Sequence, residues 1–146
     1  MKNPQTLAQN LSRVFPNEKL KSIADYGCCA FCLLWYLDID CSDTDALVIL
    51  ADMIDTGALD EECTVYWAQS VTHLTGRNLE ALERKNIDSI KGIKKAIVRY
   101  SNGKKSHWVG VENGEIAFNS LVFSNAVECG KPVEIRIPKI SGETTK

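Results

Sequence analysis

The stretch Asp25-Tyr-Gly-Cys-Cys-Ala-Phe-Cys-Leu-Leu-Trp-Tyr-Leu37 decides the fold of this 146-residue chain. After Gly27 it is apolar on every side for about ten residues, which is too short to span a bilayer and typical of a helix buried in a core. Cys28 and Cys29 would occupy the first turn of that helix. Free N–H groups and the positive end of the helix dipole favour an anion there, so we expect a lowered thiol pKa and a nucleophilic thiolate.

Helical patterns surround this buried helix, and strand patterns follow it. Hydrophobic spacing and end signals predict helices over residues 6–15, 28–37, 45–55 and 64–75, and a short further helix over 78–86. Alternating apolar residues predict strands over 96–100, 108–112, 115–121 and 133–137, and Asn113-Gly114 is a strong two-residue hairpin signal.

Helices first and strands second predict an α+β domain. We expect the N-terminal helices, with the buried central helix among them, to pack on a C-terminal antiparallel sheet. Residues 1–140 are predicted to form a single domain, and residues 141–146 (SGETTK) a polar tail.

Composition excludes several classes of protein. A hydrophobic fraction of 45% and a net charge of −2 are ordinary for a globular domain. The first fifteen residues are too polar for a signal peptide and no segment is long enough to cross a membrane, so we expect a cytoplasmic protein that does not bind membranes. The six cysteines are then predicted to be reduced thiols.

Charge is unevenly distributed along the chain. Residues 38–62 contain nine carboxylates and no Lys or Arg, whereas residues 84–105 contain eight Lys or Arg and one acid, Asp88. A nucleic-acid surface also needs aromatic side chains among its basic ones, and only Tyr100 lies in the basic stretch. We therefore expect solvated faces and no nucleic-acid partner.

A thiol nucleophile needs a general base, and a third group that orients that base. His107 opens the first strand of the Asn-Gly hairpin, and the returning strand brings residues 118–120 back toward it. Counting from the turn pairs His107 with Ser120, with Asn119 one residue off, and a bulge would shift this pairing by one. The Asn119 carbonyl is therefore a candidate to orient the imidazole.

Metal and cofactor sites are not expected. Cys29 and Cys32 have a zinc-ligand spacing, with Cys63, Cys129 and His107 as conceivable further ligands. However, the close pair lies in a buried helical run and the other cysteines are single. The chain also has no phosphate loop and no dinucleotide fingerprint.

The arrangement of these residues resembles the papain-like cysteine peptidase superfamily. Gly27-Cys28 at the head of a helix is similar to the double-glycine bacteriocin-processing peptidases, and residues 107–119 resemble the strand–turn–strand of bacterial cell-wall endopeptidases. The resemblance implies a papain-like fold with Cys28 as nucleophile, His107 as base and Asn119 as orienting group. Cys29 stays open as an alternative nucleophile.

Most of the segment 20–137 also resembles a small family of bacterial and phage proteins. These proteins share the Gly-Cys helix start, the segment Gly57–Glu62 and the His hairpin. That likeness implies no particular function. One departure from papain-like peptidases concerns Ser22. It stands where they place a Gln that completes the oxyanion hole, and loss of such a donor costs roughly 10²–10³ in turnover.

Three functions follow from these patterns. The leading hypothesis is a cysteine hydrolase that cleaves an amide bond in a peptide or peptidoglycan fragment through an acyl-thioenzyme. The second is a catalytically silent papain-like accessory of a phage or mobile element that binds a host protein. The third is a structural module whose thiols only pack in a core.

Overall fold

The computed structural model describes residues 1–142, and this part of the chain forms six helices and a five-stranded antiparallel sheet. The helices are α1 (Pro4–Ser12), α2 (Glu18–Tyr26), α3 (Cys28–Tyr36), α4 (Asp43–Thr56), α5 (Trp67–Thr75) and α6 (Asn125–Glu128). The strands are β1 (Leu79–Asn86), β2 (Lys95–Ser101), β3 (Ser106–Glu112), β4 (Glu115–Phe118) and β5 (Lys131–Ile140). The predicted α+β class is confirmed, and the predicted tail lies outside the described residues from residue 143 onward.

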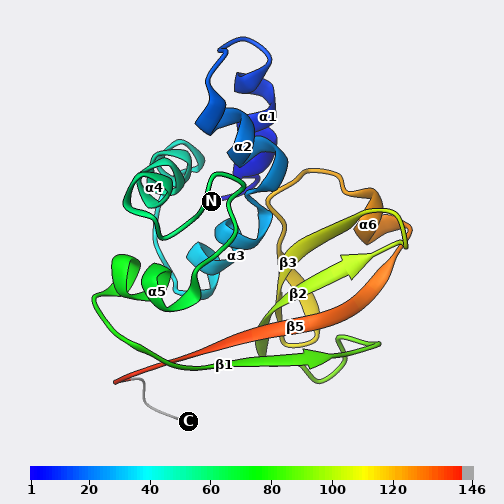
Figure 1. Ribbon diagram of the computed structural model, residues 1–146. Helices are drawn as coiled ribbons and strands as arrows, with labels where there is room; N and C mark the ends of the chain where they lie inside the picture. Colours follow the sequence, from blue (N-terminus) through cyan, green and yellow to red (C-terminus); the bar gives the residue numbers. More distant parts are fainter. Residues whose placement is uncertain (143–146) are drawn as a thin grey trace.

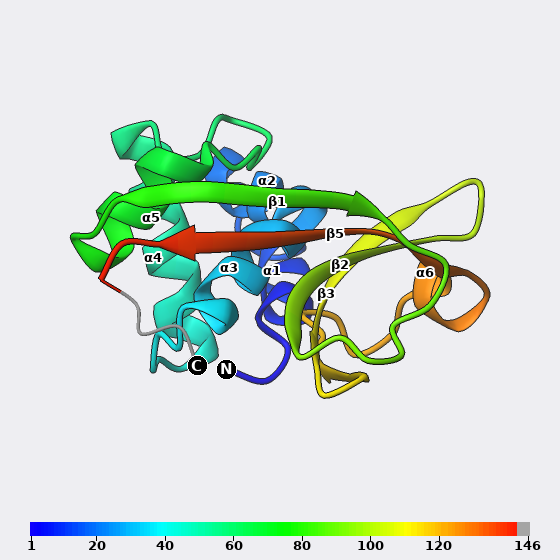
Figure 2. The same ribbon diagram turned by 90° about the horizontal axis from the view of Figure 1, so that it is seen from below.

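The first five helices lie beside the sheet, and α3 lies between the other helices and the strands (Figure 1). The strand order is β1-β5-β2-β3-β4, and every neighbouring pair is antiparallel. Seen from below, β1 and β5 run together along one side of the helical part (Figure 2). The boundary between the helices and the strands is where the site residues lie.

Helix α3 is buried as predicted, since residues 30–34 are all inaccessible to solvent. Gly27 lets α2 continue almost directly into α3, because no side chain fits at that position. A Cβ there would lie 2.6 Å from the Ile23 carbonyl oxygen and 2.9 Å from the Phe31 ring. This close approach fixes Cys28 and Cys29 at the start of α3.

The hairpin of β3 and β4 packs directly against α3. A Cβ at Gly110 would lie 2.4 Å from the Trp35 ring, and Phe118 stacks on the same ring with the centroids 6.3 Å apart. The Asn113-Gly114 turn is confirmed, with φ of 54° and 75°, as a type I′ turn requires. A second core covers the other face of the sheet and comprises Ala96, Val98, Tyr100, Val109, Val111 and Ile135.

The prediction of a short helix over residues 78–86 is wrong, because this segment is strand β1. Its Leu, Glu and Ala residues favour helix locally, but the segment pairs along β5 from Leu79 to Asn86. β1 is an edge strand, and its charged side chains are typical of edges that avoid further pairing. Long-range pairing thus overrode local propensity at β1. Helix α2 was not predicted.

Candidate active site

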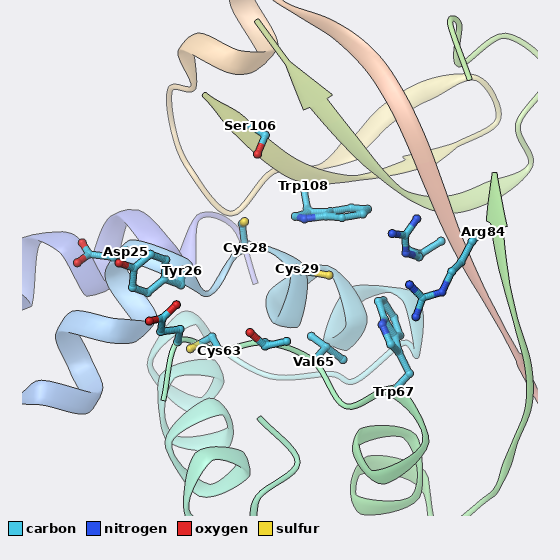
Figure 3. Close-up of a pocket in the computed structure, with 13 residues that line it drawn as sticks. Asp25, Tyr26, Cys28, Cys29, Cys63, Val65, Trp67, Arg84, Ser106 and Trp108 are labelled. Carbon is cyan, nitrogen blue, oxygen red and sulfur yellow. The ribbon is translucent and has the colours of Figure 1, made fainter. Parts of the chain in front are cut away.

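A cleft of about 510 Å³ lies between the helical part and the sheet. Cys28 and Cys29, at the N-terminus of α3, lie in its middle, with Trp108 on the sheet side and Cys63 and Val65 on the other (Figure 3). The complete lining is Asp25, Tyr26, Cys28, Cys29, Glu62, Cys63, Thr64, Val65, Trp67, Arg84, Ser106, Trp108 and Arg136. Both candidate nucleophiles therefore line the cleft.

The Cys28 thiol does not have the lowered pKa that its helix position predicts. The residue is half-buried, and close packing around its sulfur disfavours the thiolate and raises the pKa. The backbone N–H groups of Trp108, Cys29 and Cys28 favour the thiolate and oppose this rise without overcoming it. The expected effect of the helix start is present, but desolvation is larger.

The other thiols near the cleft are less suited to attack. Burial raises the pKa of Cys29, and the neighbouring Cys28 adds to that rise, while Arg136 partly offsets it. Burial also raises the pKa of Cys32, which is wholly inaccessible in the core, and raises the pKa of Cys63 to about 11. A second, smaller cavity is lined by His107. Among Cys28, Cys29, Cys32 and Cys63, only Cys28 also lines it.

His107 and Asn119 are brought together as the sequence pattern predicts. Asn119 Oδ1 lies 2.7 Å from His107 Nε2, and the same oxygen accepts the backbone N–H of Leu121 at 3.0 Å. The bond holds Nε2 as the protonated ring nitrogen, because an amide oxygen only accepts. Nδ1 is then free to accept a proton from another group.

A β-bulge makes this bond possible. The β3–β4 register runs Glu112–Glu115 and Val111–Ile116, and then shifts by one residue to Gly110–Phe118. With that shift Asn119 shares a face with His107, whereas an unshifted register would place it on the opposite face. Sequence counting identified the two residues, and the bulge decided that they meet.

The second cavity, of about 290 Å³, is lined by both Cys28 and His107. No hydrogen bond joins Cys28 Sγ to His107 among the described residues. Burial lowers the pKa of His107, although the hydrogen bond that His107 donates to Asn119 opposes the shift. At neutral pH the Cys28 thiol and the His107 imidazole are therefore both neutral.

The first turn of α1 braces the segment that carries Asn119, a feature that sequence reasoning missed. The backbone N–H groups of Gln5 and Thr6 both donate to the Ser120 carbonyl oxygen, and the Asn3 side chain donates to the Asn119 carbonyl oxygen. The buried Gln5 side chain accepts from Ser120 Oγ at 2.7 Å and donates to the Ala24 carbonyl oxygen at 2.9 Å. Gln5 thus joins α2, three residues before Gly27, to the segment after β4.

Ser22, which the resemblance places at the oxyanion position, lies away from Cys28. Its hydroxyl donates to the Glu61 carbonyl oxygen and lies 3.8 Å from Cys63 Sγ, and the residue lines neither cavity that contains Cys28. Over residues 1–142, His, Cys, Asp and Glu side chains nowhere gather in a group of three or more that could hold a metal ion.

Comparisons of the chain with known protein families, with curated proteins and with solved structures gave no match. None of the helices in the described part of the chain is long and apolar enough to cross a membrane.

Proposed function

We propose that this protein is a papain-like cysteine hydrolase that cleaves an amide bond in a peptide or peptidoglycan fragment. The observation that carries the proposal is the 2.7 Å hydrogen bond from His107 to Asn119, in a cavity shared with a thiol at a helix N-terminus. A nucleophile, a base and an orienting group are the three parts that thiol catalysis needs. The free thiols of all six cysteines support a cytoplasmic location.

The reaction would begin from the neutral thiol. As Cys28 Sγ attacks the substrate carbonyl carbon, its proton passes to Nδ1 of His107, and the C–O double bond opens to an oxyanion. Collapse of this intermediate breaks the C–N bond, and the leaving amine takes the proton from His107. Water then attacks the thioester with His107 again as base, and the acid product and the thiol are released. Asn119 holds the imidazole throughout.

Cys28 is the favoured nucleophile over Cys29 because it alone shares a cavity with His107. The proposal requires the thiol and imidazole to close to hydrogen-bond reach when substrate binds, as they do in many enzymes whose free form is looser. The N–H groups of Cys29 and Trp108 near the sulfur are the candidate oxyanion donors, in place of the absent Gln.

The test is acylation of Cys28 by a neutral activated ester such as p-nitrophenyl acetate, followed by intact mass and peptide mapping. We expect a burst of p-nitrophenol with one acetyl group on Cys28, loss of both in Cys28→Ala, and retention of both in Cys29→Ala. Cys129→Ala, which removes an exposed thiol, is the matched surface control. Acetylation that maps to Cys29, or that is equal in Cys28→Ala and parent, would contradict the assignment.

The raised pKa of Cys28 favours one alternative, a catalytically silent papain-like domain that binds a host protein. This alternative predicts no burst with any activated ester, together with specific capture of a partner through the same cleft. The acylation experiment separates the two functions.

A further inference from the structure

Two arginines lie side by side at one end of the cleft, where nothing in the proposed chemistry needs them. Arg84 of β1 and Arg136 of β5 are directly opposite each other in the antiparallel ladder, and both line the cleft that contains Cys28 and Cys29. Like charges directly opposite on neighbouring strands destabilise a sheet. A compensating anion at this place would remove that cost.

The protein itself neutralises only part of this charge. Glu134 pairs with Arg136 at 3.1 Å and with Arg99 at 2.5 Å, so one carboxylate is shared between two guanidinium groups. Arg84 is exposed and takes part in none of the ion pairs of the described residues. A net positive charge therefore remains at this end of the cleft.

Aromatic side chains give this charged end a defined shape. The Arg136 guanidinium lies over the Trp108 ring, with its central carbon 5.3 Å from the ring centroid, and this cation–π contact orients it. Figure 3 shows Arg84 extending toward Trp67, which lines the same cleft. Arginine side chains held in this way suit a planar carboxylate, which accepts two parallel N–H donors.

The far end of the cleft carries a carboxylate in place of the arginines. Asp25 lies there and pairs with Lys21 at 3.4 Å, and Figure 3 places Asp25 and Arg84 on opposite sides of Cys28 and Cys29. A substrate carboxylate is therefore attracted to the arginine end, where positive charge remains uncompensated. The cleft would thus bind an acidic peptide in one direction across the thiols.

We infer that Arg84 and Arg136 form a subsite for a carboxylate of the substrate, which makes the substrate an acidic peptide or peptidoglycan stem. This inference rests on the proposed function, because the ligand is a substrate only if the protein is a hydrolase. Binding of the carboxylate itself does not require catalysis. The carboxylate belongs either to an acidic side chain or to a free C-terminus, and both present the same chemistry to the two guanidinium groups.

Binding of short peptides to the Cys28→Ala variant tests the inference without any turnover. The probes are acetyl-Ala-Ala-Glu-Ala and acetyl-Ala-Ala-Gln-Ala, each with a free or an amidated C-terminus, titrated by calorimetry or by NMR. We expect a peptide with the recognised carboxylate to bind about tenfold more tightly than its neutral counterpart, as hydrogen bonds to charged groups allow. A preference for Glu over Gln identifies a side-chain carboxylate, and a preference for the free terminus identifies a C-terminal one.

Arg84→Gln and Arg136→Gln should each abolish most of this preference. Lys85→Gln is the matched control, because it makes the same charge change at the next residue of β1, which does not line the cleft. Arg84 is exposed, so its variant keeps the test valid if Arg136→Gln, which loses its pairing with Glu134, fails to fold.

Equal binding of all four peptides, or equal effects of Arg84→Gln and Lys85→Gln, would overturn the subsite. The ester used to acylate Cys28 is neutral, so the two proposals fail separately. Acylation without carboxylate preference removes the subsite and leaves the hydrolase, whereas carboxylate preference without acylation removes the hydrolase and leaves the subsite.

Discussion

The two cavities that meet at Cys28 differ in chemistry. The larger one has two arginines, Arg84 and Arg136, at one end, whereas Asp25 lines both cavities. The smaller one contains the buried His107. If the proposed function holds, the larger cavity selects the ligand and the smaller one is where the proton moves.

Removing the His107 imidazole should have the largest effect and tests whether the two cavities have separate roles. His107→Ala should slow acylation of Cys28 by about 10²–10⁴-fold, the usual contribution of a general base, and should leave peptide binding in the larger cavity unchanged. Burst kinetics and calorimetry on the same variant measure the two effects. The matched control is His73→Ala, which removes an imidazole paired with Asp52 at 3.0 Å on the helical side. Equal rates in the two variants would contradict the role of His107.

Removing the Gln5 side chain, which braces the segment after β4, should have the next largest effect. Gln5→Ala leaves Ser120 Oγ and the Ala24 carbonyl oxygen without their partner and should lower the free energy of unfolding by about 1–3 kcal/mol. It should also slow acylation while keeping the carboxylate preference. Urea titration and burst kinetics measure these changes, and Gln9→Ala, on the same helix and the same cavity wall, is the control. A Gln5 variant with normal stability would show that the brace is unimportant.

The pH dependence of stability probes the smaller cavity alone. Burial lowers the pKa of His107 in the folded state, so the unfolded chain binds the proton more readily. The free energy of unfolding should therefore fall as the pH drops below about 6.5, and this contribution should be constant above that value. His107→Gln should flatten this part of the curve in urea titrations between pH 5 and 8. An unchanged curve would mean that the imidazole is not desolvated.

The smallest expected effect is on thiol reactivity. Because burial raises the pKa of Cys28, its rate of alkylation by iodoacetamide should keep rising with pH beyond the ordinary range of a thiol. Peptide mapping after timed labelling measures the rate at Cys28 and, as an internal reference, at the exposed Cys129. A plateau below pH 7 would instead indicate a thiolate–imidazolium pair. The thiolate would then exist before substrate binds, and His107 would not act as a base during the attack.

Local patterns predicted much of the fold. A run that is apolar on every side can only be buried, and Asn-Gly between two strand patterns readily supplies the positive φ values of a tight hairpin turn. The helical composition of residues 79–86 misled the prediction, because the partners of β1 in β5 lie 48 to 61 residues further along the chain. Arg84, at the centre of that segment, therefore could not be placed in the cleft from sequence.

The sequence by itself determined which chemical groups are available, namely thiols at the start of a buried helix and a histidine and an asparagine on one hairpin. The tertiary structure decided how these groups meet and behave. One bulged residue brings Asn119 to the face of His107, and packing around Cys28 raises a pKa that the helix position alone would lower. The physical reason is that residue type and periodicity act locally, whereas register and desolvation depend on the whole folded surroundings.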